Sequence, residues 1–123
     1  PVGSIVVNMQ REPLLPPAEL AAAGKGRLPV TRVMAGLEAA GLGRRAARPG
    51  ESAAARTARV RATAEALIAE GIEHAQRVQL EREQRAVLTG LNRPLVELPA
   101  LAEGIDLGAL YDLAERLTEQ GPA

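Results

Sequence analysis

The histidine and cysteine content limits the chemistry that this chain can do. His74 is its single histidine and cysteine is absent, which excludes thiol catalysis, disulfides and thiolate metal sites. Glu70 precedes His74 by one helical turn, but a pair of side chains is too small for a metal site, and a catalytic dyad would lack a nucleophile. We therefore interpret His74 as a structural or exposed residue.

Two glycine-containing stretches have a superficial likeness to loops that bind phosphate. Gly24-Lys25 could end a P-loop, but Glu19 stands where that motif needs glycine and Gly26 where it needs serine or threonine. The run Gly41–Ala46 fits the loose dinucleotide pattern G-x-G-x-x-A, yet it follows a predicted helix instead of a strand. Neither stretch is predicted to bind a cofactor.

Asn8 is the polar side chain best placed to bind a ligand. It ends the run Ile5-Val6-Val7, whose β-branched residues without polar alternation predict a strand of a parallel sheet. A second strand is predicted at 95–98, and Pro99 ends it because proline cannot donate to a sheet ladder. If the two strands are parallel, their carboxyl ends, Asn8 and Leu98-Pro99, lie at the same edge of the sheet, where ligands of open α/β sheets bind. The alternative is a strand-terminal asparagine that bonds only its own loop.

Helices must connect and cover these strands. The run from Ala53 to about Thr89 contains no proline and keeps apolar residues at helical spacing, with Ser52 as a plausible N-cap. Gly71 marks either a bend in this helix or a close packing contact. A last helix is expected after Asp106, also an N-cap, and its apolar face is predicted to lie on the sheet. That face consists of Leu107, Leu110, Tyr111, Ala114 and Leu117.

Three stretches of the chain carry a family resemblance. They are the opening PVGSIVVN, the helix GIEHAQRVQLEREQRAVL and the close PLVELPALAEGIDLGALYDLAERL. In order and spacing they resemble the C-terminal part of the ArsA-like ATPases. These P-loop proteins include the arsenite-pump (anion-transporting) ATPase and the guided-entry ATPase that targets tail-anchored membrane proteins. The resemblance covers roughly residues 1–9 and 70–120.

The resemblance implies an α/β fold class. We expect a partial parallel sheet of two strands with long helices, as a fragment of a P-loop NTPase Rossmann-like domain. Residues 1–9 would form a strand of the ATPase sheet, and residues 10–69 a helical insert with a linker near 42–51. Residues 70–123 would form a helix-strand-helix that closes the ATPase domain.

The resemblance also implies a role at the adenine end of an ATP site. In the family, the asparagine that ends the strand, here Asn8, contacts the adenine base. The loop after the last strand, here Pro99 to Gly104 with Ala100 and Leu101, wraps its other side. ATP or ADP would be the ligand, and the helical arm would be coupled to nucleotide state. The phosphate loop and the magnesium ligands would lie upstream of Pro1, so this chain alone is expected to have no ATPase activity.

The chain departs from the family in its lack of cysteine. The zinc-clasped dimer of the guided-entry ATPases and the thiolate capture of arsenite cannot be carried over. A homo- or hetero-oligomer is still expected, because two strands cannot bury both faces of Ile5-Val6-Val7. Residues 10–69 would be the place for a protein client.

The charge distribution motivates an alternative function, a non-enzymatic helical interaction module. Net charge is zero, with 15 basic and 15 acidic residues. The segment Lys25–Arg61, however, has nine basic residues against Glu38 and Glu51, and could bind a partner protein or an acidic surface. Nucleic acid is not expected as a partner, since Tyr111 is the single aromatic residue.

The hydropathy of the chain bears on its location. No secretory signal and no apolar run near 18 residues occurs in the sequence. We therefore expect a cytoplasmic chain without stable membrane insertion.

Overall fold

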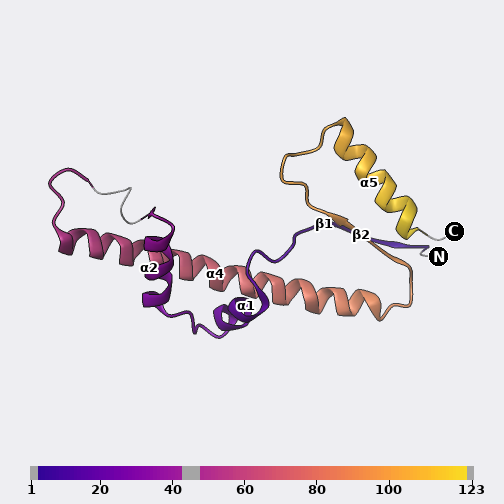
Figure 1. Ribbon diagram of the computed structural model, residues 1–123. Helices are drawn as coiled ribbons and strands as arrows, with labels where there is room; N and C mark the ends of the chain where they lie inside the picture. The colour runs from indigo at the N-terminus through magenta and orange to yellow at the C-terminus, as the bar shows by residue number, and fades with distance from the viewer. Residues whose placement is uncertain (1–2, 43–47, 122–123) are drawn as a thin grey trace. The chain divides into compact units, whose positions relative to one another are not determined.

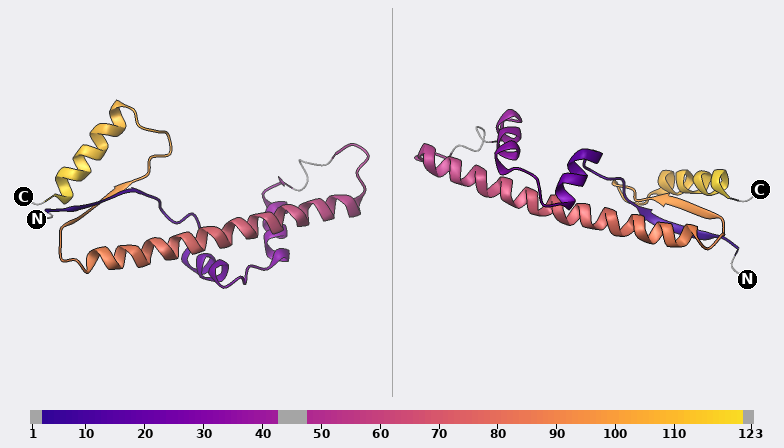
Figure 2. Two further views of the ribbon diagram at one scale, coloured as in Figure 1. Left: turned by 180° about the vertical axis from the view of Figure 1, so that it is seen from behind. Right: turned by 90° about the horizontal axis from the view of Figure 1, so that it is seen from below.

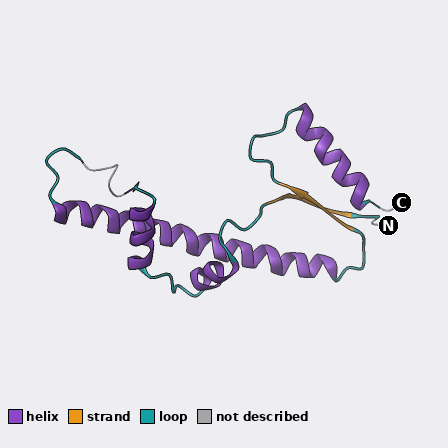
Figure 3. Cartoon of the chain, in the orientation of Figure 1, coloured by secondary structure: helices purple, strands orange, loops and turns teal. Residues whose placement is uncertain are grey.

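The computed structural model describes residues 3–42 and 48–121 (Figure 1). Its elements are β1 (Ile5–Gln10), α1 (Pro17–Gly24), α2 (Val30–Ala39), α4 (Ala53–Thr89), β2 (Leu95–Pro99) and α5 (Leu107–Gln120). The chain divides into two compact units. We call Pro1–Leu14 with Leu80–Ala123 the strand unit, and Leu15–Gln79 the helical unit. Figure 3 shows helices in both units and strands in the first. Residues 43–47 of the predicted linker lie outside the described residues.

The two strands pair in parallel, which confirms the predicted α/β class and two-stranded parallel sheet. Their register places Ile5 opposite Leu95, Val6 opposite Val96 and Val7 opposite Glu97. Side chains alternate between the faces of a strand, so Val96 and Leu98 share one face and Glu97 has the other. Val96 and Leu98 are 3% and 8% exposed, and they are the buried core of the strand unit.

Glu97 connects β2 to the last turns of α4. The carboxylate atom Glu97 Oε1 lies 2.5 Å from Arg85 Nη2 in an ion pair whose Glu97 side is largely buried. Since Glu97 is on the face opposite Val96 and Leu98, this ion pair fixes which face of β2 the end of α4 meets. The sheet therefore has a charged contact on one face and an apolar one on the other.

The last helix begins as predicted but presents a different face. The Asp106 side chain accepts a hydrogen bond from the Ala109 N–H at 2.8 Å, which confirms the N-cap. The helix packs on β2, and both views of Figure 2 show it beside the sheet. Its half-buried residues are Ala109 and Leu113. The predicted apolar face is wrong, because Leu107 and Tyr111 are 70% and 71% exposed. A sheet of two strands is too narrow to cover the whole apolar surface of α5.

The long helix α4 is continuous over 37 residues. Ser52 caps it as predicted, since its Oγ accepts a hydrogen bond from the Ala55 N–H at 3.1 Å. Gly71 lies within α4, where a methyl group would be 3.5 Å from the Leu28 side chain and 3.9 Å from Leu15. The predicted packing contact at Gly71 is thus confirmed.

Two small apolar clusters hold the helical unit together. In the first, Leu20 and Ala23 of α1 pack with Ala75 and Val78 of α4. In the second, Leu37 of α2 packs with Val60 and Ala64 of α4, flanked by Val30, Val33 and Met34. Ala23 and Ala64 are fully buried, so small side chains let the helices approach closely. All buried residues of this unit contact α4 or belong to it.

A partly buried ion pair fixes the start of α4. Glu51 accepts hydrogen bonds from Arg59 Nε and Nη2, both at 2.9 Å, and one from the Arg48 N–H at 3.3 Å. The Glu51 side chain is 12% exposed. The hydrogen bond from Arg59 holds the pKa of Glu51 at about 2, and the same contact raises the pKa of Arg59. This carboxylate joins the segment that precedes α4 to the second turn of the helix.

We expect Gly71→Ala to stabilise the chain by roughly 0.5–1 kcal/mol. Alanine is the better helix former, and its methyl group would meet Leu28 and Leu15 at ordinary van der Waals distances. Gly36→Ala in α2 is the matched control, because nothing lies within 4 Å of the position that its added methyl group would take. Urea unfolding of both variants measures the change. A loss of stability for Gly71→Ala alone would contradict this packing.

We expect Glu51→Gln to reduce the acid sensitivity of folding. The pKa of Glu51 is lowered from 4.5 to about 2 in the folded chain, so its contribution is present above 4.5 and is lost as pH falls through 2. Urea unfolding between pH 2 and pH 6 compares the variant with the unsubstituted chain. Glu65→Gln is the control, because its ion pair with Arg61 is more than half exposed. Equal pH slopes for Glu51→Gln and the unsubstituted chain would refute the assignment.

Candidate functional site

Parallel pairing brings the predicted site residues to one end of the sheet. After the Val7–Glu97 pair the register shifts, and Gln10 lies opposite Pro99. The Ala100 N–H then donates to the Gln10 carbonyl oxygen at 2.8 Å. Asn8 and the loop that begins at Pro99 therefore lie toward the same, carboxyl end of β1 and β2, the edge at which open α/β sheets bind ligands.

The register shift is a β-bulge at Asn8 and Met9. Between the Val7 and Gln10 pairs, β1 has one residue more than β2, which is how a bulge is built. Met9 has a φ of 57°, in the left-handed region that few residues other than glycine adopt. The prediction that the strand ends at Asn8 is thus wrong by two residues. Pattern reading missed the extension because Met9 and Gln10 are not β-branched.

The Asn8 carboxamide has a partner within its own loop. Its Oδ1 accepts a hydrogen bond from the Met9 N–H at 2.8 Å, and this bond supports the left-handed backbone at Met9. The side chain is exposed. Oδ1 has a second lone pair and Nδ2 has two N–H groups, so the carboxamide retains a donor and an acceptor for a ligand.

The loop after β2 forms the other side of this site. Pro99, Ala100 and Leu101 are each half-buried. The Gly104 N–H points to the Leu101 carbonyl oxygen at 3.4 Å, and Gly104 has a φ of 82° that favours glycine. The loop thus turns back directly after Leu101. All four predicted site residues, Asn8, Pro99, Ala100 and Leu101, lie at the same end of the sheet.

Gln120 makes contacts that the sequence did not reveal. The Glu97 N–H donates to Gln120 Oε1 at 3.0 Å, and Gln120 Nε2 donates to the Glu97 carbonyl oxygen at 3.1 Å. One carboxamide therefore satisfies both backbone groups of a strand residue. The partners are 23 positions apart, so no local pattern could have indicated the contact.

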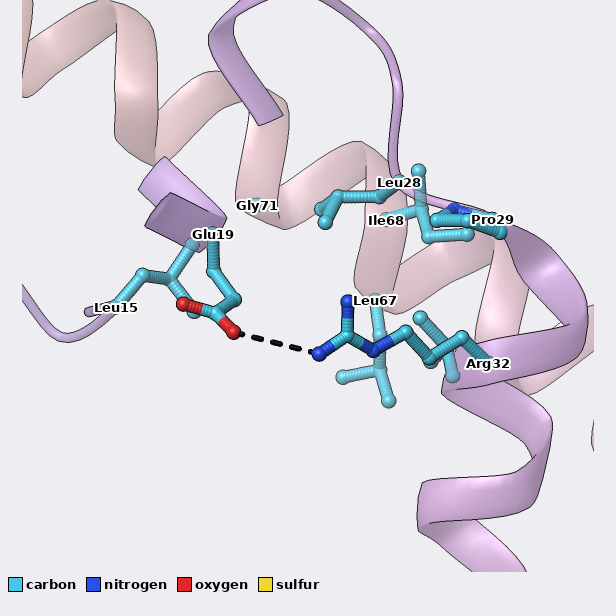
Figure 4. A pocket seen from close by; sticks show the side chains of 9 residues that line it. Leu15, Glu19, Leu28, Pro29, Arg32, Leu67, Ile68 and Gly71 are labelled. Atoms are coloured by element: carbon cyan, nitrogen blue, oxygen red, sulfur yellow. Dashed lines mark ion pairs between the residues drawn. The ribbon is translucent and has the colours of Figure 1, made fainter. Parts of the chain in front are cut away.

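A separate apolar pocket lies wholly within the helical unit (Figure 4). Its volume is about 350 Å³, and most of its lining is apolar: Leu15 and Leu28 from the segments on either side of α1, Val33 of α2, and Leu67 and Ile68 of α4. Arg32 and Glu19 also line it, and an ion pair at 3.6 Å joins them. Gly71 forms part of the wall, so α4 contributes backbone as well as side chains to this pocket.

Part of the positive charge of the basic segment Lys25–Arg61 is neutralised by ion pairs within the chain. Arg32, Arg59 and Arg61 each form an ion pair with a nearby glutamate, namely Glu19, Glu51 and Glu65. Arg44 and Arg45 lie outside the described residues. Partial neutralisation by these ion pairs weakens the electrostatic argument for a general acidic partner.

His74 is a structural residue in this fold. It is 9% exposed, and Arg77 Nη2 lies 3.2 Å from its Nδ1. Across residues 3–42 and 48–121, no group of three or more histidine, aspartate or glutamate side chains is arranged to hold a metal ion. The predicted structural role of His74 agrees with its burial beside the first apolar cluster.

Among the helices within residues 3–42 and 48–121, none has both the length and the apolar character needed to cross a membrane.

We expect Asn8→Ala to lower the free energy of unfolding by roughly 0.5–1.5 kcal/mol, because it removes the hydrogen bond to the Met9 N–H. Asn8→Asp is the matched control, since a carboxylate oxygen can accept the same bond. Urea unfolding should show a loss for alanine and little change for aspartate. Equal losses in the two variants would mean that the bond to Met9 does not stabilise the bulge.

The chain is similar to ATPase BagA of Mycobacterium tuberculosis, with 36% identity over 121 residues. The same identity relates it to a protein of Mycobacterium bovis that is also named as an ATPase. These 121 residues are 98% of this chain and 31% of each relative, so the chain spans about a third of the length of these relatives. No known family model matches the chain. The similarity shows that the chain is related to ATPases.

Proposed function

We propose that this chain is the C-terminal portion of an ArsA-like ATPase and supplies the adenine end of its ATP site. The observation that supports the proposal is the parallel pairing that puts Asn8 and the Pro99–Leu101 loop toward the same, carboxyl end of the two strands, where Ala100 bonds Gln10. The 36% identity to ATPase BagA over nearly the whole chain supports it, as does the order of the resembling stretches.

The chemistry of Asn8 suits adenine. Adenine offers a donor at N6 and an acceptor at N7 on one edge, and a carboxamide matches both at once. In this role, Asn8 Nδ2 donates to N7 while Oδ1 accepts from N6 and keeps its bond to the Met9 N–H. The half-buried Pro99, Ala100 and Leu101 give the base an apolar surface on the other side.

The helical unit is the proposed arm that responds to nucleotide. It is joined to the strand unit through α4, one continuous helix that begins in the helical unit and ends in the strand unit. The Arg85–Glu97 ion pair ties the end of α4 to β2, the strand that leads into the proposed base loop. A shift of β2 on nucleotide binding therefore has a direct connection to α4.

The phosphate and magnesium groups of such a site belong to the remaining two thirds of the longer ATPase. Neither Gly24-Lys25 nor Gly41–Ala46 has the sequence or the preceding strand that a phosphate loop needs. We also propose that the longer ATPase acts on a transported anion or a protein client. In the same proposal it is located in the cytoplasm and forms a homo- or hetero-oligomer.

We expect Asn8→Ala in the complete ATPase to weaken ATP binding by roughly 1–3 kcal/mol and to leave GTP binding nearly unchanged. Guanine presents two acceptors, O6 and N7, on the edge where adenine presents a donor and an acceptor, so a fixed carboxamide prefers adenine. Calorimetric titration with ATP and with GTP measures both affinities.

Asn8→Asp separates base binding from the structural role of Asn8. Aspartate keeps an acceptor for the Met9 N–H but cannot donate to N7, so ATP affinity should fall while the melting temperature is retained. Equal losses for ATP and GTP in the alanine variant would refute the adenine assignment.

We expect the isolated chain to hydrolyse no ATP. It has no phosphate loop and, within its described residues, no cluster of acidic and histidine side chains that could hold magnesium. A phosphate-release assay on the chain purified to homogeneity is the test. Hydrolysis that co-purifies with the chain through successive columns would overturn the proposed division of the site.

A further inference from the structure

The pocket of the helical unit lies between the two apolar clusters of that unit. Leu15 and Leu28 line it and pack against the first cluster, whereas Val33 lines it and packs against the second. Ile68 and Gly71 complete the wall, and in the sequence of α4 they lie between the residues that this helix gives to the two clusters. The pocket is therefore a stretch of the core that neither cluster fills.

The lining of the pocket has apolar surface left for a ligand. Four of its side chains are half-buried, namely Leu15, Leu28, Val33 and Ile68. Leu67 is 43% exposed. The volume of about 350 Å³ falls in the range of small-molecule sites, which are mostly apolar with a few polar groups that fix the orientation of the ligand. The apolar part of the pocket thus suits an aliphatic tail.

The charged residues in the lining are Glu19, in the first turn of α1, and Arg32, in the first turn of α2. Figure 4 shows their charged ends pointing toward each other. The separation of 3.6 Å is too long for a hydrogen bond, and the Arg32 side chain is 77% exposed. An exposed ion pair of this kind contributes little to stability, so both groups can exchange each other for a ligand at small cost.

The balance of these two charges selects the class of ligand. A ligand with a carboxylate alone would pair with Arg32 and leave Glu19 unpaired beside a second negative charge. A ligand with an ammonium alone would leave Arg32 unpaired in the same way. A zwitterion provides a partner for each side chain and leaves neither charge uncompensated.

We propose that this pocket binds a free amino acid with a large aliphatic side chain. The α-carboxylate pairs with Arg32, the α-ammonium pairs with Glu19, and the aliphatic side chain lies in the apolar part of the pocket. Because Glu19 and Arg32 belong to different helices, the ligand joins α1 to α2 as their direct ion pair does. This site goes beyond the proposed ATP site and lies wholly in the helical unit.

Calorimetric titration of L-leucine into the complete ATPase, without nucleotide, tests the proposal. We expect saturable binding with a dissociation constant below about 1 mM. Three probes that each lack one feature should bind at least about tenfold more weakly: 4-methylpentanoate has no ammonium, 3-methylbutylamine no carboxylate and glycine no tail. Absence of saturable binding up to about 10 mM L-leucine would overturn the proposal, as would equal affinities for L-leucine and 4-methylpentanoate.

Substitutions of the two charged residues place the ligand in this pocket. Arg32→Gln and Glu19→Gln should each weaken L-leucine binding at least about tenfold. Glu19→Gln should also reduce the preference for L-leucine over 4-methylpentanoate, because Arg32 then has no competing carboxylate. A purely structural role of Glu19 would not change that preference.

Arg61→Gln is the matched control for these substitutions. Its ion pair with Glu65 is also exposed, but neither residue lines the pocket. L-leucine affinity should be unchanged in this variant. Equal losses in Arg61→Gln and Arg32→Gln, or an unchanged affinity in Arg32→Gln, would overturn the proposal.

The outcome is independent of the adenine assignment. The L-leucine titrations contain no nucleotide, and Asn8 belongs to the strand unit. Failure of L-leucine to bind leaves the ATP and GTP affinities of the Asn8 variants interpretable, and the reverse also holds.

Discussion

The parallel pairing of β1 with β2 is the interaction on which the rest of the strand unit depends. It joins residues about 90 positions apart, such as Val7 and Glu97, and α1, α2 and α4 lie in the crossover between them. Loop-closure entropy grows slowly with length, so a crossover of this size costs little more than a shorter one. The pairing in turn places Gln10 beside Ala100 and sets which backbone groups of Glu97 face Gln120.

The helical unit depends instead on alanine packing along one helix. Its clusters are centred on Ala23, Ala64 and Ala75, and no large side chain among the described residues is fully buried. Small residues allow close approach but bury little apolar area each, so the clusters contribute modestly. The bidentate Glu51–Arg59 pair adds a polar constraint at the start of α4. Such light packing suits a unit that we propose to act as an arm responding to nucleotide.

The sequence predicted the features whose signals are local. The Ser52 and Asp106 caps, the uninterrupted helix α4 and the β-branched run of β1 each follow from a few neighbouring residues. Parallel pairing followed from a topological rule, and it brought all four predicted site residues to one end. The errors concern contacts that depend on distant partners. The exposure of Leu107 and Tyr111 reflects the width of the sheet, which no property of α5 encodes. The role of Gln120 depends on Glu97 lying within reach of the last turn of a helix.

The bulge at Asn8 and Met9 makes a structural role and a binding role for Asn8 compatible. A carboxamide that bonds its own backbone is usually taken as occupied, but the Met9 N–H uses one lone pair of Oδ1 and neither N–H of Nδ2. The same bond holds Met9 at a φ of 57°, which costs free energy that the surrounding pairing of Gln10 with Pro99 must offset. Backbone strain of this kind is found at functional sites. A β-bulge beside such a site changes the direction of a side chain on the strand that it interrupts. A regular strand would have turned Asn8 to the face opposite Val7 and left its orientation to solvent. The bulge and the bond to Met9 hold the Asn8 side chain within the last turn-like part of β1, so the structural bond is a means of orienting the group that we propose to bind the base.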